Sequence, residues 1–221
     1  MNRGVLASLR DLVPNRPLRH VEALRIAELQ ASRLLAMAGT FEAPVPESLI
    51  LNIPKVAMKR ISPWPVSGCT DWAKGTWVIV VNGAESRLRQ RFTLAHEFKH
   101  ILDYRHIDVI YPATFSLSHK QRAEMTCDYF AGCLLVPKTW LKRAWGNGIQ
   151  SLPALSETFA VSQQAIQTRL LQTGLIDPPA RCSNTAEGFR FRRMSSFSEA
   201  DATTHTFPRY EFQTAAVTAD Q

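Results

Sequence analysis

The sequence lacks any apolar run long enough to cross a membrane, for which a helix needs about 20 residues. Its longest apolar stretches, Trp77 to Val81 and Leu134 to Val136, fall far short, and the N-terminus lacks the apolar core of a signal peptide. Cysteine is scarce as well, and no CxxC pair occurs among Cys69, Cys127, Cys133 and Cys182. We therefore expect a soluble, cytoplasmic protein with reduced thiols and no membrane contact.

The sequence does contain enough apolar material for a core. Its 221 residues are 45% hydrophobic, which suits one domain of ordinary size or one domain with a small appendage. The formal net charge of +7 permits contact with nucleic acid or another acidic surface. Many proteins carry such a charge without binding either, so the charge alone decides nothing about partners.

The first half of the chain predicts a helix and then strands. Apolar residues at helical spacing predict an amphipathic helix over residues 18–38, and a short helix follows near 46–53. Two β-branched runs, Val56 to Ile61 and Trp77 to Val81, predict strands. The second run, or its neighbour, is a candidate edge strand that pairs with an extended peptide, and an ordinary interior strand is the equal alternative.

Two longer helices are predicted after the strands. Ser86 is placed to cap a helix that runs from Arg87 to about Tyr104. Ser118 and Gln121 have capping-box spacing ahead of a second amphipathic helix, which Pro137 ends. Strands followed by helices indicate an α+β fold with a small twisted sheet.

The first of these helices carries an HExxH motif at His96, Glu97 and His100. Histidines four residues apart lie on one helix face, so both imidazoles can bind one Zn²⁺. Glu97 is then placed beside the open coordination position, where it can serve as the general base and acid of peptide hydrolysis. A chance match on a charged helix is the alternative.

A catalytic zinc site needs a third protein ligand, and two residues compete for that role. His106 follows His96 by ten residues, as in the metzincin pattern, although Asp103 occupies the position where that pattern has glycine. Glu124 lies on the next helix, with Asp128 one turn further on to hold the free N–H of a ligand histidine. An exposed polar stripe is the common alternative for such a pair of carboxylates. Candidate donors to the carbonyl oxygen are Tyr104, His106 and Tyr129.

Two sequence blocks resemble the ImmA/IrrE family of zinc metallo-endopeptidases. The first runs from Arg89 to His100 and reads RQRFTLAHEFKH, and the second runs from Glu124 to Pro137. The family pattern reads RFTLAHELGH and then ExxA[ND]xFAxxLLMP. The departures of this chain from it include Lys99 and Cys127, neither of which removes a ligand. The resemblance implies that His96, His100 and Glu124 bind zinc and that the protein cleaves a helix-turn-helix repressor.

The sequence pattern of residues 152–175 is typical of a helix-turn-helix, with Ser162 capping the second helix. In one interpretation the pair contacts DNA or a partner through polar residues, namely Gln163, Gln164, Gln167 and Arg169. In the other, which we favour, the pair packs on the core through Leu155, Phe159, Ile166 and Leu170. A DNA-binding regulator that retains a non-proteolytic zinc fold is therefore the alternative function.

Together these patterns divide the chain into four segments. They are an N-terminal extension (1–17), a zincin-like metallopeptidase domain (18–145), a helix-turn-helix-like subdomain (146–180) and a tail (181–221). The tail is rich in Ser, Thr, Ala and charge without periodicity, which predicts disorder. It also holds a short basic and aromatic patch that is a weak indication of a nucleic-acid or protein partner: Phe189, Arg190, Phe191, Arg192 and Arg193.

Overall fold

The computed structural model describes residues 4–115 and 117–178. Within this part of the chain the sheet has three strands, β1 (Val56–Ile61), β2 (Gly68–Ala73) and β3 (Thr76–Asn82), in the order β1-β3-β2. β1 is parallel to β3, and β2 is antiparallel to it. The expected strand at Trp77 to Val81 is therefore confirmed, but it is the interior strand. The free edge nearest the motif helix belongs to its neighbour β2.

A tight turn fixes the pairing of β2 with β3. Ala73 is opposite Thr76, so only Lys74 and Gly75 connect the strands. Both have positive φ, 49° and 78°, which is the conformation of the hairpin turn that matches the twist of a sheet. The turn therefore sets which residues of β2 face the helix beneath the sheet.

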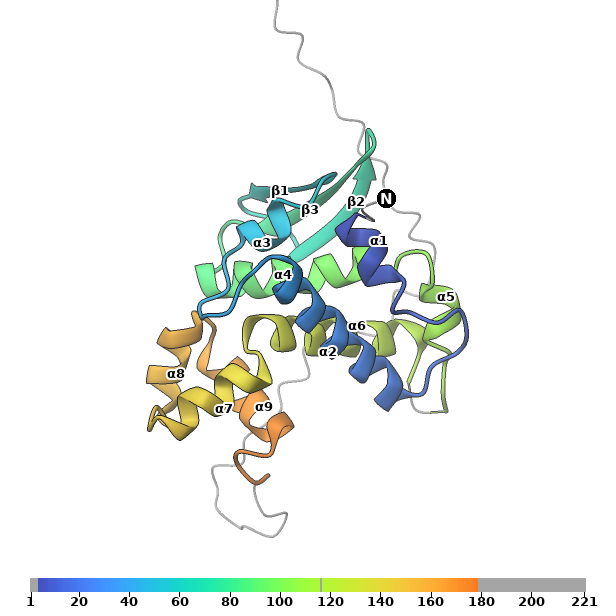
Figure 1. Cartoon of the computed structure of the whole chain (residues 1–221). Coiled ribbons are helices and arrows are strands. Elements are labelled where there is room, and N and C mark those ends of the chain that lie inside the picture. Colours follow the sequence, from blue (N-terminus) through green and yellow to red (C-terminus); the bar gives the residue numbers. More distant parts are fainter. Residues whose placement is uncertain (1–3, 116, 179–221) are drawn as a thin grey trace, which may run out of the picture. The chain divides into compact units, whose positions relative to one another are not determined.

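Three helices form the core beneath the sheet (Figure 1). α4 (Arg87–Asp103) packs against β2 and β3, α6 (His119–Leu135) packs on α4, and α2 (His20–Met37) packs on α6. Their contact residues are fully or almost fully buried, as at Leu34, Phe98 and Phe130. The three helices expected from the sequence are confirmed, and so is the predicted α+β fold with a small sheet.

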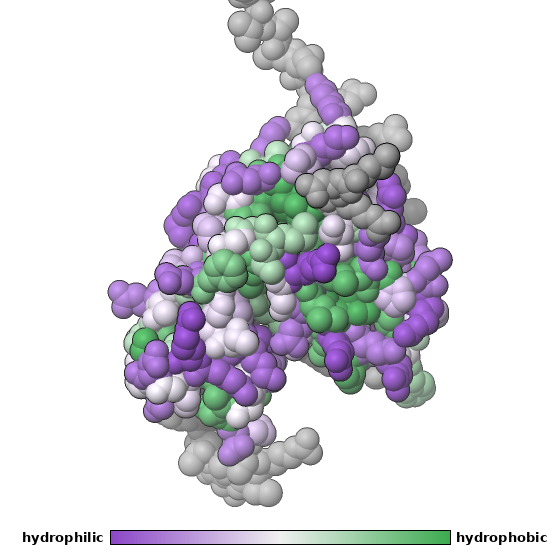
Figure 2. Space-filling view, viewed as in Figure 1, coloured by the Kyte–Doolittle hydropathy of each residue, from purple (hydrophilic) through white to green (hydrophobic). Residues whose placement is uncertain are grey.

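The N-terminal extension contributes a helix that the sequence did not predict. α1 (Val5–Arg10) packs against α2 and α4, and Leu9 is completely buried. Arg10 donates to the carbonyl of Ile101 at 2.7 Å, and Gln30 Nε2 donates to the carbonyl of Leu9 at 3.0 Å. Figure 2 shows apolar residues gathered around α3 (Ser48–Leu51) and between α1 and α2, with polar residues around them.

A charged pair is buried within the motif helix itself, one turn apart. Lys99 Nζ lies 2.5 Å from Asp103 Oδ1, and both side chains are 1% exposed. Tyr111, from the loop after α5 (Ile107–Ile110), donates to the other oxygen of Asp103. Burial and the Asp103 carboxylate raise the pKa of Tyr111, so its hydroxyl stays a donor. Lys99, where the family pattern has glycine, thus neutralises a buried carboxylate.

Three shorter helices complete the described chain: α7 (Lys138–Gly146), α8 (Leu152–Phe159) and α9 (Gln163–Thr173). The apolar residues that we expected to pack the α8–α9 pair onto the core are all buried: Leu155, Phe159, Ile166 and Leu170. Arg169 is buried too, because its guanidinium donates to the carbonyl of Val136 and lies over the Tyr129 ring. Its predicted role as a DNA or partner contact is therefore wrong, whereas Gln163 and Gln164 are exposed.

The described residues form one compact unit. The domain boundaries at residues 18 and 146 stay predictions, and the tail with its Phe189 to Arg193 patch lies outside the described residues. None of the helices in the described part of the chain is both long and apolar enough to span a membrane. The cysteines at 69, 127 and 133 are free thiols.

Candidate metal centre

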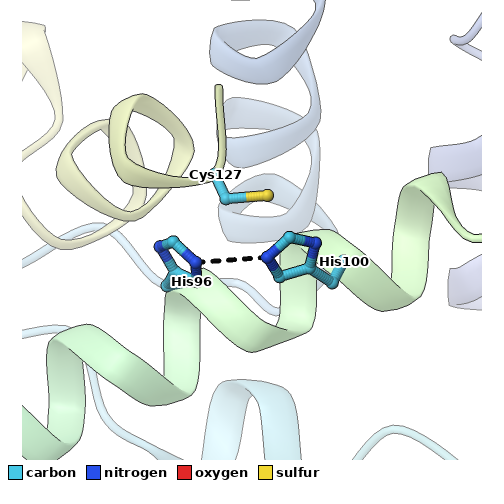
Figure 3. Close-up of side chains that lie close together, drawn as sticks. All are labelled: His96, His100 and Cys127. Carbon is cyan, nitrogen blue, oxygen red and sulfur yellow. Dashed lines mark hydrogen bonds between the residues drawn. The ribbon is translucent and has the colours of Figure 1, made fainter. Parts of the chain in front are cut away.

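Two histidines on α4 form the centre of the candidate site. The Ser86 hydroxyl accepts from Arg89 N and starts α4, and the helix continues without a break through His96 and His100. Their Nε2 atoms lie 3.2 Å apart, and both rings point toward α6 (Figure 3). The HExxH spacing thus brings two imidazole nitrogens to one point.

Helix α6 brings a carboxylate to the same point. Its N-terminus has the predicted capping box, in which Ser118 and Gln121 each bond the other's backbone N–H. Two turns into the helix, Glu124 Oε2 lies 3.2 Å from His96 Nε2, and its Oε1 lies 3.6 Å from His100 Nε2. Hydrogen bonds with His100 and then His96 hold the pKa of Glu124 well below its usual value, so the group is an anion.

These three side chains fit a tetrahedral metal ion. An ion with bonds of about 2.0–2.1 Å has ligand atoms about 3.3–3.4 Å apart. The two Nε2 atoms lie 3.2 Å apart, and their distances to the Glu124 carboxylate, 3.2 Å from His96 to Oε2 and 3.6 Å from His100 to Oε1, are close to that length. Two neutral imidazoles and one carboxylate are also a ligand set that Zn²⁺ uses in catalytic sites.

Asp128 orients the first histidine. Its Oδ1 lies 2.9 Å from His96 Nδ1. This contact places an N–H on Nδ1, so that Nε2 is the ring nitrogen whose lone pair can bind a metal. Without an ion, burial opposes protonation of His96, but the hydrogen bonds with Asp128 and Glu124 prevail and raise its pKa to about 9, so a metal must displace the proton of Nε2 when it binds. Glu124 and Asp128 thus contact the two ring nitrogens of His96, which is the arrangement predicted for this pair of carboxylates.

Glu97 lies beside the histidines, on the side of the sheet. The residue is 9% exposed, and its Oε2 accepts a 2.8 Å hydrogen bond from Thr70 Oγ1 of β2. Gly68 makes room for it, since a Cβ there would lie 2.4 Å from Thr93 Cγ2 and 3.3 Å from Glu97 Cγ. The sequence motif identified Glu97, whereas Thr70 lies on β2 and was not predicted from the sequence.

Cys127 was missed as a candidate ligand. Its Sγ and one nitrogen each of His96 and His100 lie within 4.8 Å of one another (Figure 3). Burial, and then the charge of Asp103, raises the pKa of the thiol well above its usual value. Since a thiol or a carboxyl group binds a metal as its anion, Glu124 is the better prepared of the two donors. The signal in the sequence was the three-residue spacing from Glu124, which places Cys127 on the same helix face.

The remaining candidates lie apart from the contacts around Glu124. His106 occupies the N-cap position of α5 and lines a cavity of about 650 Å³ together with residues of α1 such as Val5 and Arg10. Tyr104 ends α4 and packs on Trp77, and Tyr129 lies beneath the guanidinium of Arg169. The contacts to both motif histidines therefore come from Glu124, and the role of a tyrosine as a donor to the carbonyl oxygen stays a prediction.

This combination of a small mixed sheet, an HExxH helix and a carboxylate from the next helix defines a zincin-like core. A family model for the IrrE N-terminal-like domain (Peptidase_M78) matches residues 54–171, which is just over half of the chain. The chain belongs to this family. The resemblance seen in the two motif blocks is thereby confirmed.

A solved structure gives a second comparison. A Mycobacterium tuberculosis transcriptional regulator has a TM-score of 0.54 and 18% sequence identity to this chain, over 76% of this chain and 52% of that one. At this identity the similarity shows the fold alone. The present chain spans about half the length of that regulator. No curated protein is similar enough in sequence to count as a match.

Proposed function

We propose that this protein is a cytoplasmic zinc-dependent endopeptidase whose substrate is a helix-turn-helix repressor. The observation that carries the peptidase proposal is the triangle of His96, His100 and Glu124, with Glu97 held beside it by Thr70. Membership of the Peptidase_M78 family supports the same chemistry. The choice of a repressor as substrate rests on the family resemblance of the two motif blocks, and the cytoplasm on the free thiols.

The residues of this chain divide the chemistry among them. His96, His100 and Glu124 would hold the ion, and Asp128 would keep Nε2 of His96 available to it. A bound Zn²⁺ would acidify a water molecule to a pKa of about 7 and polarise the scissile carbonyl. Glu97 takes the proton of the attacking water and passes it to the leaving amine. Thr70 holds the Glu97 carboxylate for both transfers.

The test compares wild type with Glu97→Gln, using Glu157→Gln on the exposed surface of α8 as a matched control. Each is purified for zinc analysis and co-expressed with a helix-turn-helix repressor encoded beside its gene. We expect one zinc per chain in all three proteins and a cleavage rate about 10²–10⁴-fold lower in Glu97→Gln only. Undiminished cleavage by Glu97→Gln, or wild type without zinc, would refute the peptidase proposal.

A DNA-binding regulator is the second candidate, because the α8–α9 pair exposes Gln163 and Gln164 at the start of α9. The burial of Arg169 removes one of the contacts on which it rested. Binding of duplex DNA that is lost in a Gln163→Ala, Gln164→Ala double variant, without any proteolysis by wild type, is the result that would favour this candidate.

A further inference from the structure

Three aromatic side chains form a row next to the candidate site. Trp77 of β3 stands in the middle, with its ring centroid 5.0 Å from that of Trp72 on β2 and 4.8 Å from that of Tyr104 at the end of α4. Trp77 is 8% exposed, whereas Trp72 is 48% and Tyr104 is 62% exposed. Large aromatic side chains with this exposure are typical of binding surfaces rather than of a core.

The free edge of β2 runs past this row. Asn82 N donates to Ser67 O at 2.9 Å, which makes that pair a hydrogen-bonded one. Pairs alternate along antiparallel strands, so the backbone N–H and C=O groups of Gly68, Thr70 and Trp72 point away from β3. These groups are placed to pair with one extended peptide.

Glu97, the candidate catalytic group, and the aromatic row lie along the same face of β2. Side chains two apart on a strand share a face, so Thr70, which holds Glu97, and Trp72 both face α4. The two positions are about 6.6–6.8 Å apart along the strand, which equals two residues of a paired peptide. A peptide whose scissile bond lies at Glu97 therefore presents the side chain two residues away to the aromatic row.

From this register we propose that Trp72, Trp77 and Tyr104 form a specificity subsite that takes a large apolar side chain of the substrate, two residues from the cleaved bond. The inference rests on the proposed endopeptidase function. Asp71, between Thr70 and Trp72, faces the other side of the strand and is exposed. The substrate side chains on that side, at every second position, therefore face water. The substrate class is thus an extended peptide segment with Leu, Ile, Met or Phe at one fixed position.

The test profiles the cleavage sites of zinc-loaded protein on a tryptic digest of a bacterial proteome by mass spectrometry. For a peptide that is cut, kcat/KM is then compared between matched versions with Leu or Ser at the subsite position. We expect wild type and Trp72→Phe to have a higher kcat/KM for the Leu peptide than for the Ser peptide. Trp72→Ala and Tyr104→Ala should lower that ratio about tenfold. Phe41→Ala, an exposed aromatic residue outside the row, is the control and keeps the ratio. A ratio does not change when a variant is merely less folded.

A binding measurement separates failure of the subsite from failure of the proposed function. An array of ten-residue peptides, matched in pairs that differ only by Leu or Ser at one position, is probed with Glu97→Gln protein, which needs no cleavage. Leu-selective binding that Trp72→Ala removes supports the subsite even if wild type cuts nothing, in which case only the peptidase proposal fails. Cleavage without any apolar preference two residues from the bond, or a preference that survives in both alanine variants, overturns the subsite.

Discussion

Glu124 and Cys127 both reach the motif histidines from α6, and their ionisation separates them. Glu124→Ala should weaken zinc binding by roughly 100-fold or more, because the ion loses its anionic ligand, whereas Cys127→Ala should change it less than about threefold. Zinc titration in the presence of a competing chelator measures both. Loss of zinc from Cys127→Ala with full binding by Glu124→Ala would reverse the assignment. His106→Ala serves as the control and should bind zinc normally.

The pair of Lys99 and Asp103 makes a second prediction for single residues. Lys99→Met should lower the free energy of unfolding by about 3–5 kcal/mol, because the carboxylate of Asp103 would stay buried without a counter-charge. The double variant with Asp103→Asn should recover most of that loss, since no charge is left uncompensated. Urea unfolding of the three proteins checks this. A loss below about 1 kcal/mol for Lys99→Met would show that the pair is not protected from water.

At the scale of elements, the turn between α8 and α9 depends on one residue in a left-handed conformation. Ala160 has φ 49° and ψ 51°, which costs a residue with a Cβ about 1–2 kcal/mol. Ala160→Gly should therefore stabilise the protein by about 0.5–1 kcal/mol after the added entropy of the unfolded chain is subtracted. The same change at Ala154, inside α8, should destabilise it by about as much. Equal signs in thermal unfolding of the two variants would contradict this.

Sequence patterns predicted individual helices and strands better than they predicted contacts between them. Ser86 and the Ser118–Gln121 box marked the starts of α4 and α6 correctly, because capping depends on neighbours in sequence. α1 escaped prediction since its six residues are too few to show periodicity and its stability comes from packing on α2 and α4. The exposure of Arg169 was predicted wrongly for a similar reason, because an arginine that faces the protein interior cannot be told from sequence alone from one that faces water.

At the scale of the whole molecule, a metal bound at the candidate centre would join α4 and α6, which come from different parts of the chain. Zinc that binds the folded protein only should stabilise it by about 2.7 kcal/mol at a free concentration 100 times Kd. We therefore expect a chelator to lower the Tm of wild type and to leave the Tm of His100→Ala unchanged. A thermal shift assay with and without zinc measures the effect. An equal response of both proteins would mean that the ion binds elsewhere.

The sequence by itself determined the α+β class and the starts of α4 and α6, because periodicity and capping are local properties. It also predicted His96, Glu97, His100, Glu124 and Asp128 as site residues, with Glu124 favoured over His106 by the family resemblance of the two motif blocks. Only the tertiary structure decided that β2 rather than Trp77 to Val81 is the free edge beside the motif helix, and that Thr70 holds Glu97. It also brought Cys127 to the histidines and the aromatic row to the strand edge. The reason is physical: strand order and contacts between distant segments depend on which apolar faces bury one another, and no local pattern records that choice.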